Sequence, residues 1–145
     1  MPEELFKRTF TIHSRNFDKA GENSSEIKAI LKGLNFDSDI IRRVVVVAFE
    51  AEMNVVMYAR VGTLTFRITE ENIQIEIMDE GPGIPDIDQA MQEGFSTASD
   101  EMREMGFGFG MGLPNIKRNS DSLKIESHVG KGTALFASIR LNSNA

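Results

Sequence analysis

A carboxylate and a carboxamide stand four residues apart in the middle of the chain, at Glu50 and Asn54. On a helix this spacing puts both side chains on one face, about one turn apart. An amide oxygen can ligate a hard cation such as Mg²⁺, and a carboxylate can accept a proton. The pair therefore suits phosphoryl transfer, although the spacing alone is also typical of a solvated polar stripe on an amphipathic helix.

A second candidate follows a stretch of alternating apolar residues, where Asp79 precedes Gly81, Gly83 and Ile84. The two glycines let the backbone turn tightly and lie against a flat ring. A carboxylate at the end of a strand can accept a hydrogen bond from an exocyclic amine. The simpler alternative is a rigid Gly-Pro turn.

A third candidate is rich in glycine. Nine of the 12 glycines fall between positions 81 and 132, and the densest group runs from Gly106 to Pro114, just before Lys117 and Arg118. Backbone N–H groups at the start of a helix bind anions, and glycine lets a phosphate come close. Because the spacing is neither the Walker pattern nor the dinucleotide fingerprint, we expect a phosphate loop of another kind.

The remaining polar motifs are less specific. Gly130 to Thr133 indicates a hairpin turn, with Thr133 opening the following strand. His13 and His128 show no metal-ligand spacing, and the chain has no cysteine, so disulfides, thiolate nucleophiles and cysteine-based zinc sites are excluded.

The elements that must hold these residues predict a two-layer fold. Apolar residues that alternate with polar ones favour strands, and apolar residues that recur every 3.6 positions favour helices. The stretch from Asp37 to Ala59 contains a run of four valines, but its length favours a helix. Helices grouped before strands indicate an α+β sandwich, with helices on one face of a mixed, mostly antiparallel sheet. The expected strands are Phe6 to Ile12, Thr63 to Thr69, Asn72 to Met78, Leu123 to Ser127 and Thr133 to Leu141. The expected helices are one capped by Ser24 or Ser25 and ended by residues 33–36, one capped by Asp37 or Ser38 and ending near Ala59, a short one from Asp86 to Glu93, and one from Gly112 to Asn119, with Asp79 to Pro85 as a loop.

Composition sets the class of protein. The chain has 145 residues, 41% of them hydrophobic and 26% charged, which suits one globular domain over residues 1–145. Its net charge of −6 argues against a dedicated nucleic-acid binder. No stretch reaches the ~18 apolar residues of a membrane span, so we expect no membrane association and a cytoplasmic location.

The order of the motifs resembles the four sequence boxes of the GHKL ATPase superfamily, named for gyrase, Hsp90, histidine kinases and MutL. Glu50 with Asn54, then Asp79 to Ile84, then Gly108 to Leu113, then Gly132 with Thr133 follow one another in the family's order. Within the superfamily the chain is similar to the anti-sigma-factor and stress-switch serine kinases of bacterial partner-switching modules. The resemblance implies the Bergerat ATP-binding fold.

The resemblance also implies a role for each matching residue. Glu50 would be the general base, Asn54 would hold Mg²⁺ across the phosphates of ATP, and Asp79 would accept a hydrogen bond from the adenine amine, supported by Thr133. Residues 94–107 would form a mobile lid over the nucleotide. The other implied nucleotide-binding residues are Gly81, Gly83, Ile84, Ser96, Thr97, Gly108, Phe109, Gly110, Met111, Gly112 and Leu113.

The function implied by the resemblance is a serine/threonine protein kinase. It would transfer the γ-phosphate of ATP to a small regulatory protein, a STAS-like antagonist, and a sigma factor is a further candidate partner. The main alternative is an ATP-gated binding switch that sequesters a regulator with little catalysis. A detached ATP domain of a histidine kinase is a third reading, and a homodimer stays open.

Overall fold

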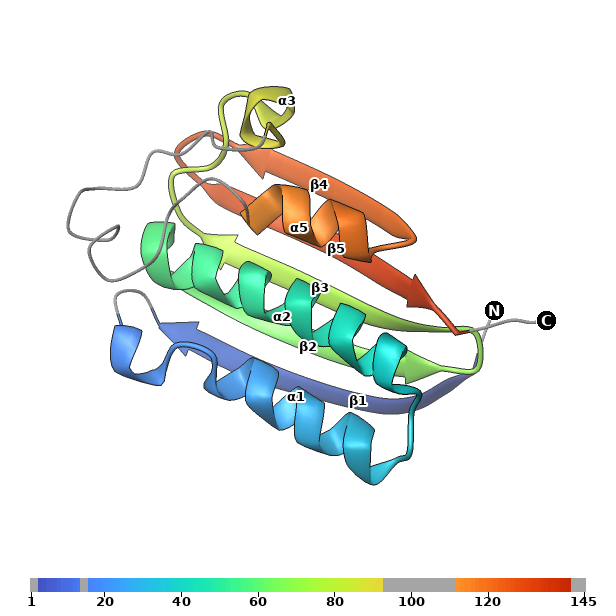
Figure 1. Ribbon diagram of the computed structural model, residues 1–145. Coiled ribbons are helices and arrows are strands. Elements are labelled where there is room, and N and C mark those ends of the chain that lie inside the picture. Colours follow the sequence, from blue (N-terminus) through green and yellow to red (C-terminus); the bar gives the residue numbers. More distant parts are fainter. Residues whose placement is uncertain (1–2, 14–15, 93–111, 142–145) are drawn as a thin grey trace.

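The computed structural model describes residues 3–13, 16–92 and 112–141. Five strands and four α-helices follow one another along this part of the chain, with one short 3-10 helix after the first strand (Figure 1). They are β1 (Glu4–His13), η1 (Phe17–Lys19), α1 (Glu22–Gly33), α2 (Ser38–Tyr58), β2 (Val61–Thr69), β3 (Asn72–Glu80), α3 (Ile87–Ala90), α5 (Gly112–Asn119), β4 (Ser122–His128) and β5 (Gly132–Arg140).

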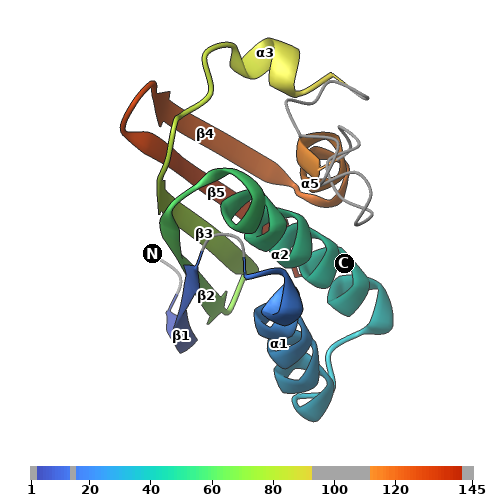
Figure 2. The same cartoon turned by 90° about the vertical axis from the view of Figure 1, so that its left-hand side faces the viewer.

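The strands form one sheet in the order β1-β2-β3-β5-β4. Helices α1, α2 and α5 cover one face of it, and α3 lies beyond one end of the layers (Figure 2). The expected α+β two-layer fold is confirmed. All four strand pairings are antiparallel, so the sheet is antiparallel rather than mixed.

The core lies between the sheet and the helices. On β3, Ile73, Ile75 and Ile77 point to the helices and are buried, while the residues between them lie on the helix-free face. Their neighbours across the sheet repeat the alternation, since Ile75 pairs with Phe66 of β2 and with Ala137 of β5. Period-2 patterning therefore decides which face of each strand joins the core.

Helix α2 runs through the centre of the helical layer. Asp37 caps it, with its side chain accepting the N–H of Asp39 at 3.1 Å, and Ala59 ends it. The expected boundaries are confirmed. The four valines belong to the helix, and two of them, Val44 and Val47, are buried in the core. The element has 21 residues without Gly or Pro, which is longer than a typical strand and suits a helix.

The expected start of α1 is wrong. The cap is Gly21, at φ 90°, and Ser24 lies inside the first turn, where its hydroxyl donates to the Gly21 carbonyl. The free N–H groups of this turn are satisfied from another helix: the buried carboxylate of Glu52 on α2 accepts from Ser24 at 3.2 Å and from Asn23 at 3.4 Å. Burial raises the pKa of Glu52, and these N–H groups oppose the rise. A tertiary contact replaces the local cap that the sequence indicated.

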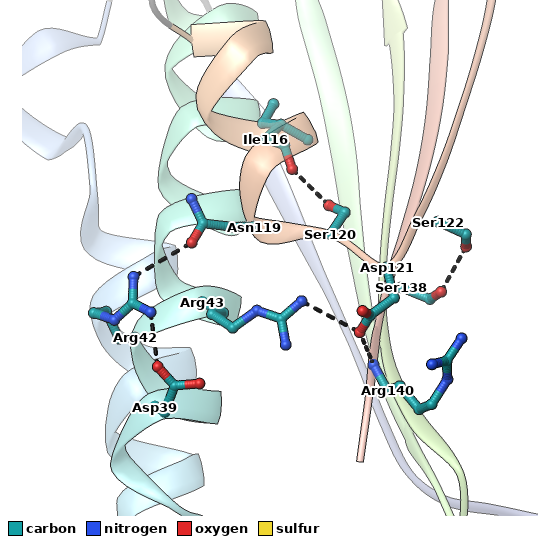
Figure 3. Close-up of polar contacts among 10 residues, drawn as sticks. All are labelled: Asp39, Arg42, Arg43, Ile116, Asn119, Ser120, Asp121, Ser122, Ser138 and Arg140. Atoms are coloured by element: carbon teal, nitrogen blue, oxygen red, sulfur yellow. Dashed lines mark hydrogen bonds and ion pairs between the residues drawn. The ribbon is translucent and has the colours of Figure 1, made fainter. Parts of the chain in front are cut away.

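Helix α5 is fixed to α2 at its C-terminal end (Figure 3). Arg42 donates to the side chain of Asn119 at 3.4 Å, and Arg43 pairs with Asp121 at 3.2 Å. Asp121 also accepts the backbone N–H of Arg140 at 2.6 Å, so one carboxylate joins α2, the turn after α5, and β5. The N–H of Arg140 and the charge of Arg43 lower the pKa of Asp121.

The remaining boundaries differ from the expected ones by a few residues. β3 continues through Asp79 and Glu80, so the loop starts at Gly81. Asp86 does cap a short helix, but α3 spans only Ile87–Ala90. No helix in the described ranges is both long and apolar enough to span a bilayer.

Candidate nucleotide site

Asp79 lies at the end of β3, facing α2. Its Oδ1 accepts the backbone N–H of Thr133, the second residue of β5, at 3.1 Å. The side chain is half-buried, and this burial raises the pKa of Asp79 above its ordinary value, while the Thr133 N–H opposes the rise. Among the described residues no donor is hydrogen-bonded to the second oxygen of this carboxylate, and recognition of an exocyclic amine would need such an acceptor.

Glycines let the backbone come close around this carboxylate. A β-carbon on Gly81 would lie 3.0 Å from Ala59 Cα and 3.3 Å from Asp79 Oδ1, and one on Gly132 would overlap the carbonyl oxygen of Asp79. Gly83 has φ 77°, and a β-carbon there would lie 2.6 Å from the carbonyl oxygen of His128. Gly83 and Gly132 are thus required by geometry, whereas a side chain at Gly81 would only be crowded, and the loop after β3 packs on the turn between β4 and β5.

Ser127 on β4 joins three parts of this end of the site, and it is not among the site residues predicted from the sequence. Its hydroxyl accepts the N–H of Ile84 at 2.7 Å and pairs with the hydroxyl of Thr133 at 3.0 Å. Thr133 therefore supports Asp79 through its own backbone N–H and is itself held by Ser127. Nothing local marks Ser127, because its partners come from distant parts of the chain.

Glu50 and Asn54 lie on one face of α2 and both are partly exposed. The first residue of α5 is beside them: a β-carbon on Gly112 would lie 3.4 Å from Asn54 Oδ1 and 3.5 Å from Glu50 Oε1. The two side-chain oxygens and the start of α5 therefore converge, which brings together three of the predicted site residues: Glu50, Asn54 and Gly112.

The Asp79 end of the site and the Glu50–Asn54 pair lie at successive positions along α2. Ala59, at the end of the helix, is next to Gly81 and Asp79, whereas Asn54 and Glu50 precede it by five and nine residues. At 1.5 Å per residue these offsets correspond to about 7.5 Å and about 13.5 Å along the helix axis. An extended ligand with a flat base at the Asp79 end would bring its phosphates to Asn54 and Glu50.

The chemistry of the side chains fits Mg-ATP. The Asn54 oxygen and the oxygens of phosphates are hard ligands, and Mg²⁺ is commonly held by one or two protein oxygens together with phosphates and water. Within the described ranges no three His, Cys, Asp or Glu side chains cluster as a metal site. The residues therefore fit a Mg²⁺ ion held by one protein oxygen together with phosphates and water, rather than one held by several carboxylates. Gly112 leaves open the space that a side chain would fill between the two oxygens.

A residue of α5 completes this end of the site. Asn115 donates its side-chain amide to Glu50 Oε2 at 2.9 Å, and Arg118 donates to Asn115 Oδ1 at 2.6 Å. The sequence predicts α5 with its observed bounds, but Asn115 is not among the predicted site residues. Its position three residues after Gly112, on the same side of the helix, was the available signal.

Part of the expected site lies outside the described residues, including the lid at 94–107. Leu113 is within the described residues and is partly buried in the first turn of α5. The expected nucleotide-binding residues outside the described ranges are Ser96, Thr97, Gly108, Phe109, Gly110 and Met111.

The sequence of this chain is similar to a known protein family and to several known proteins. The family model described as histidine kinase-, DNA gyrase B- and HSP90-like ATPase matches residues 37–143. The serine/threonine-protein kinase RsbT of Bacillus subtilis (strain 168) is 32% identical over 112 residues, which cover 74% of this chain and 78% of that protein.

Two further relatives are anti-sigma F factors. The protein from Caldanaerobacter subterraneus subsp. tengcongensis is 39% identical over 89 residues, covering 58% of this chain and 59% of its own length. The protein from Geobacillus stearothermophilus is 27% identical over 130 residues, covering 83% of this chain and 86% of its own. The family match contains both ends of the site, from Glu50 to Thr133. The chain therefore belongs to the family of histidine kinase-, DNA gyrase B- and HSP90-like ATPases.

Proposed function

We propose that this protein is a Mg-ATP-dependent serine/threonine protein kinase of a partner-switching module, acting in the cytoplasm on a small STAS-like regulatory protein. The observation that carries the proposal is the convergence of Glu50 Oε1, Asn54 Oδ1 and the start of α5 around Gly112. The likeness to a protein named as a serine/threonine kinase supports the same reaction.

The adenine end of the proposed site is set by Asp79. Its half-buried carboxylate, fixed by the Thr133 N–H, would accept from the amine of adenine. Guanine carries a carbonyl at the corresponding position and would bring two acceptors together. ATP is therefore the proposed nucleotide.

The phosphate end divides the work between two side chains. Asn54 would hold Mg²⁺, which when bound neutralises the charge of the phosphates. Glu50 would accept the proton of the acceptor hydroxyl. The hydroxyl oxygen forms a bond to the γ-phosphorus as the bond from that phosphorus to the β,γ-bridging oxygen breaks, so the products are a phosphorylated partner and ADP.

A paired measurement tests this division. Nucleotide affinity and transfer of labelled phosphate to purified STAS-like proteins encoded nearby are measured for wild type, Glu50→Ala and Asn54→Ala. Glu50→Ala should keep ATP affinity within a few-fold and lose about 10²–10⁴ in transfer rate, the usual worth of a positioned base. Asn54→Ala should lose both. Glu70→Ala, at an exposed position in the turn between β2 and β3, is the control and should change neither.

The second candidate function, an ATP-gated switch that sequesters a regulator, is favoured by the relatives named anti-sigma factors. It predicts an ATP-dependent complex with a sigma factor or other regulator and no transfer of label. Transfer by Glu50→Ala at the wild-type rate would contradict the assignment of the base. ATP-dependent complex formation without any transfer would establish the switch instead of the kinase.

A further inference from the structure

The general base of the proposed reaction is held by a helix other than its own. Glu50 belongs to α2, and its Oε2 accepts from the side-chain amide of Asn115 on α5 at 2.9 Å. Asn115 is in turn bound at its other end, since its Oδ1 accepts from Arg118 at 2.6 Å. A guanidinium has only donors, so the Asn115 oxygen must face Arg118 and its NH₂ must face Glu50. The direction of the amide is therefore fixed by chemistry.

This contact leaves the two oxygens of Glu50 unequal. Oε2 accepts the hydrogen bond from Asn115. Oε1 faces the start of α5, where a β-carbon on Gly112 would lie 3.5 Å from it and 3.4 Å from Asn54 Oδ1. Only one oxygen of the carboxylate thus faces the point where the side chain of Asn54 and the start of α5 meet. The amide of Asn115 favours the rotamer of Glu50 that produces this arrangement.

We infer that Asn115 is a positioning residue of the phosphoryl transfer proposed above, holding Glu50 so that Oε1 accepts the proton of the incoming hydroxyl. The inference rests on that proposed function. Asn115 comes three residues after Gly112, so the helix that begins at the phosphate end also orients the base. Beyond the opposite end of α5, the ion pair between Asp121 and Arg43 of α2 fixes the helix that carries the amide (Figure 3).

The isosteric change Asn115→Asp separates donation from packing. It keeps an acceptor for Arg118 and the size of the side chain, but an ionised carboxylate cannot donate to Glu50 and repels it. The expected result is a fall in kcat of phosphoryl transfer of about 10- to 100-fold with the KM for ATP within about threefold of wild type. Asn115→Ala, measured alongside with its thermal unfolding, should give a fall of the same order.

A double-mutant cycle with Glu50→Gln supplies the decisive readout. If Asn115 acts through Glu50, Asn115→Asp should cost almost nothing further in transfer rate once the base is removed. A purely structural role would instead lower the rate by the same factor in both backgrounds. The control is Asn119→Ala, which removes an asparagine one turn later on α5 that bonds Arg42 and the Asn115 carbonyl. It should lower thermal stability slightly and leave kcat within about twofold.

Each outcome is informative. Transfer by wild type together with unchanged kcat in Asn115→Asp and Asn115→Ala overturns the positioning role and leaves the kinase intact. A higher kcat in either variant also overturns it, because the contact would then restrain the base. Absence of transfer by wild type removes the kinase itself and this role with it. Lower kcat in both variants, with non-additivity against Glu50→Gln, supports the inference.

Discussion

Gly112 lies so close to Asn54 that a β-carbon on Gly112 would sit 3.4 Å from the Asn54 side-chain oxygen. That separation is an ordinary van der Waals contact, so the folded chain could accept a methyl group there. The same methyl would stand 3.5 Å from Glu50 Oε1 and fill the space where the proposed metal and phosphate would meet both side chains. A methyl group at Gly112 is therefore compatible with the fold but not with the ligand that we propose for this site.

Gly112→Ala should separate stability from function. The variant should fold and unfold at or above the wild-type temperature, since Ala is favoured over Gly in a helix by roughly 0.5–1 kcal/mol. Affinity for Mg-ATP should fall at least tenfold by calorimetry, and phosphoryl transfer should be lost.

Gly33→Ala is the matched control. Gly33 is the last residue of α1, and a β-carbon there would meet no atom within 4 Å. It should gain similar stability and bind nucleotide as wild type does. Full ATP affinity in Gly112→Ala would show that the phosphates do not approach α5 at this point.

Asp79→Asn should weaken ATP binding by removing a charged acceptor for the adenine amine. A hydrogen bond to a charged group is worth roughly 1.5–3 kcal/mol, which corresponds to a loss of about 10- to 150-fold in affinity. Calorimetry of wild type with GTP is the second arm, and binding should be poor. Equal affinities of wild type for ATP and GTP would refute the assignment of Asp79 to the base.

The same variant should not lose stability. Because burial raises the pKa of Asp79, the stability contributed by its carboxyl group is fully present below the ordinary pKa and is lost as pH rises through the raised value. The amide introduced by the substitution would carry no charge to desolvate and can still accept the Thr133 N–H. Thermal unfolding of Asp79→Asn should match or exceed wild type at neutral pH, with the advantage disappearing in acid.

Asp121→Asn should behave in the opposite way. The N–H of Arg140 and the charge of Arg43 lower the pKa of Asp121, so its stabilising contribution is present above the ordinary pKa of aspartate and is lost as pH falls through the lowered value. At neutral pH the variant should be less stable by roughly 1 kcal/mol, given the partial exposure of the pair. Urea unfolding at several pH values should show the difference shrinking in acid.

The control for Asp121 is Asp39→Asn, which breaks an ion pair with Arg42 whose side chains are 62% and 61% exposed. Exposed pairs of this kind contribute about 0.5 kcal/mol or less. A loss in Asp121→Asn no greater than in Asp39→Asn would mean that the junction of α2, α5 and β5 does not depend on this carboxylate.

Glu52→Ala should be the most destabilising of these changes. It would leave the buried N–H of Ser24 without its acceptor and open a cavity between α1 and α2, at a cost of roughly 2 kcal/mol or more. Glu52→Gln retains an acceptor and the volume, and loses the cost of burying a charge, so it should lie much closer to wild type. Equal losses in the two variants, by urea unfolding, would contradict the capping role.

The sequence predicts the elements whose signals are local. The cap at Asp37, the alternation in β3 and the entry to α5 at Gly112 are each set by residues within a few positions, and the structure has them there. The same holds for the convergence of Glu50 and Asn54, because a helix fixes the spacing of its own side chains.

What the sequence missed depends on partners far along the chain. Glu52 caps α1 from 28 residues away, Asn115 reaches Glu50 across 65, and Ser127 holds Ile84 across 43. A serine near the start of α1 was a reasonable local cap, but a buried carboxylate arriving from α2 outcompeted it. Such contacts follow from packing, which no local pattern encodes.

The position of β5 also decides when during synthesis the site can form. Of the five strands β5 is the last to leave the ribosome, yet it pairs with β3 on one side and β4 on the other. Until then, a nascent chain presents β3 with an unpaired edge, and β4 lacks the strand it pairs with. Asp79 has emerged long before, but the N–H that holds it belongs to Thr133. If Asp79 recognises adenine as we propose, the contact that holds its carboxylate forms only after β5 has been translated.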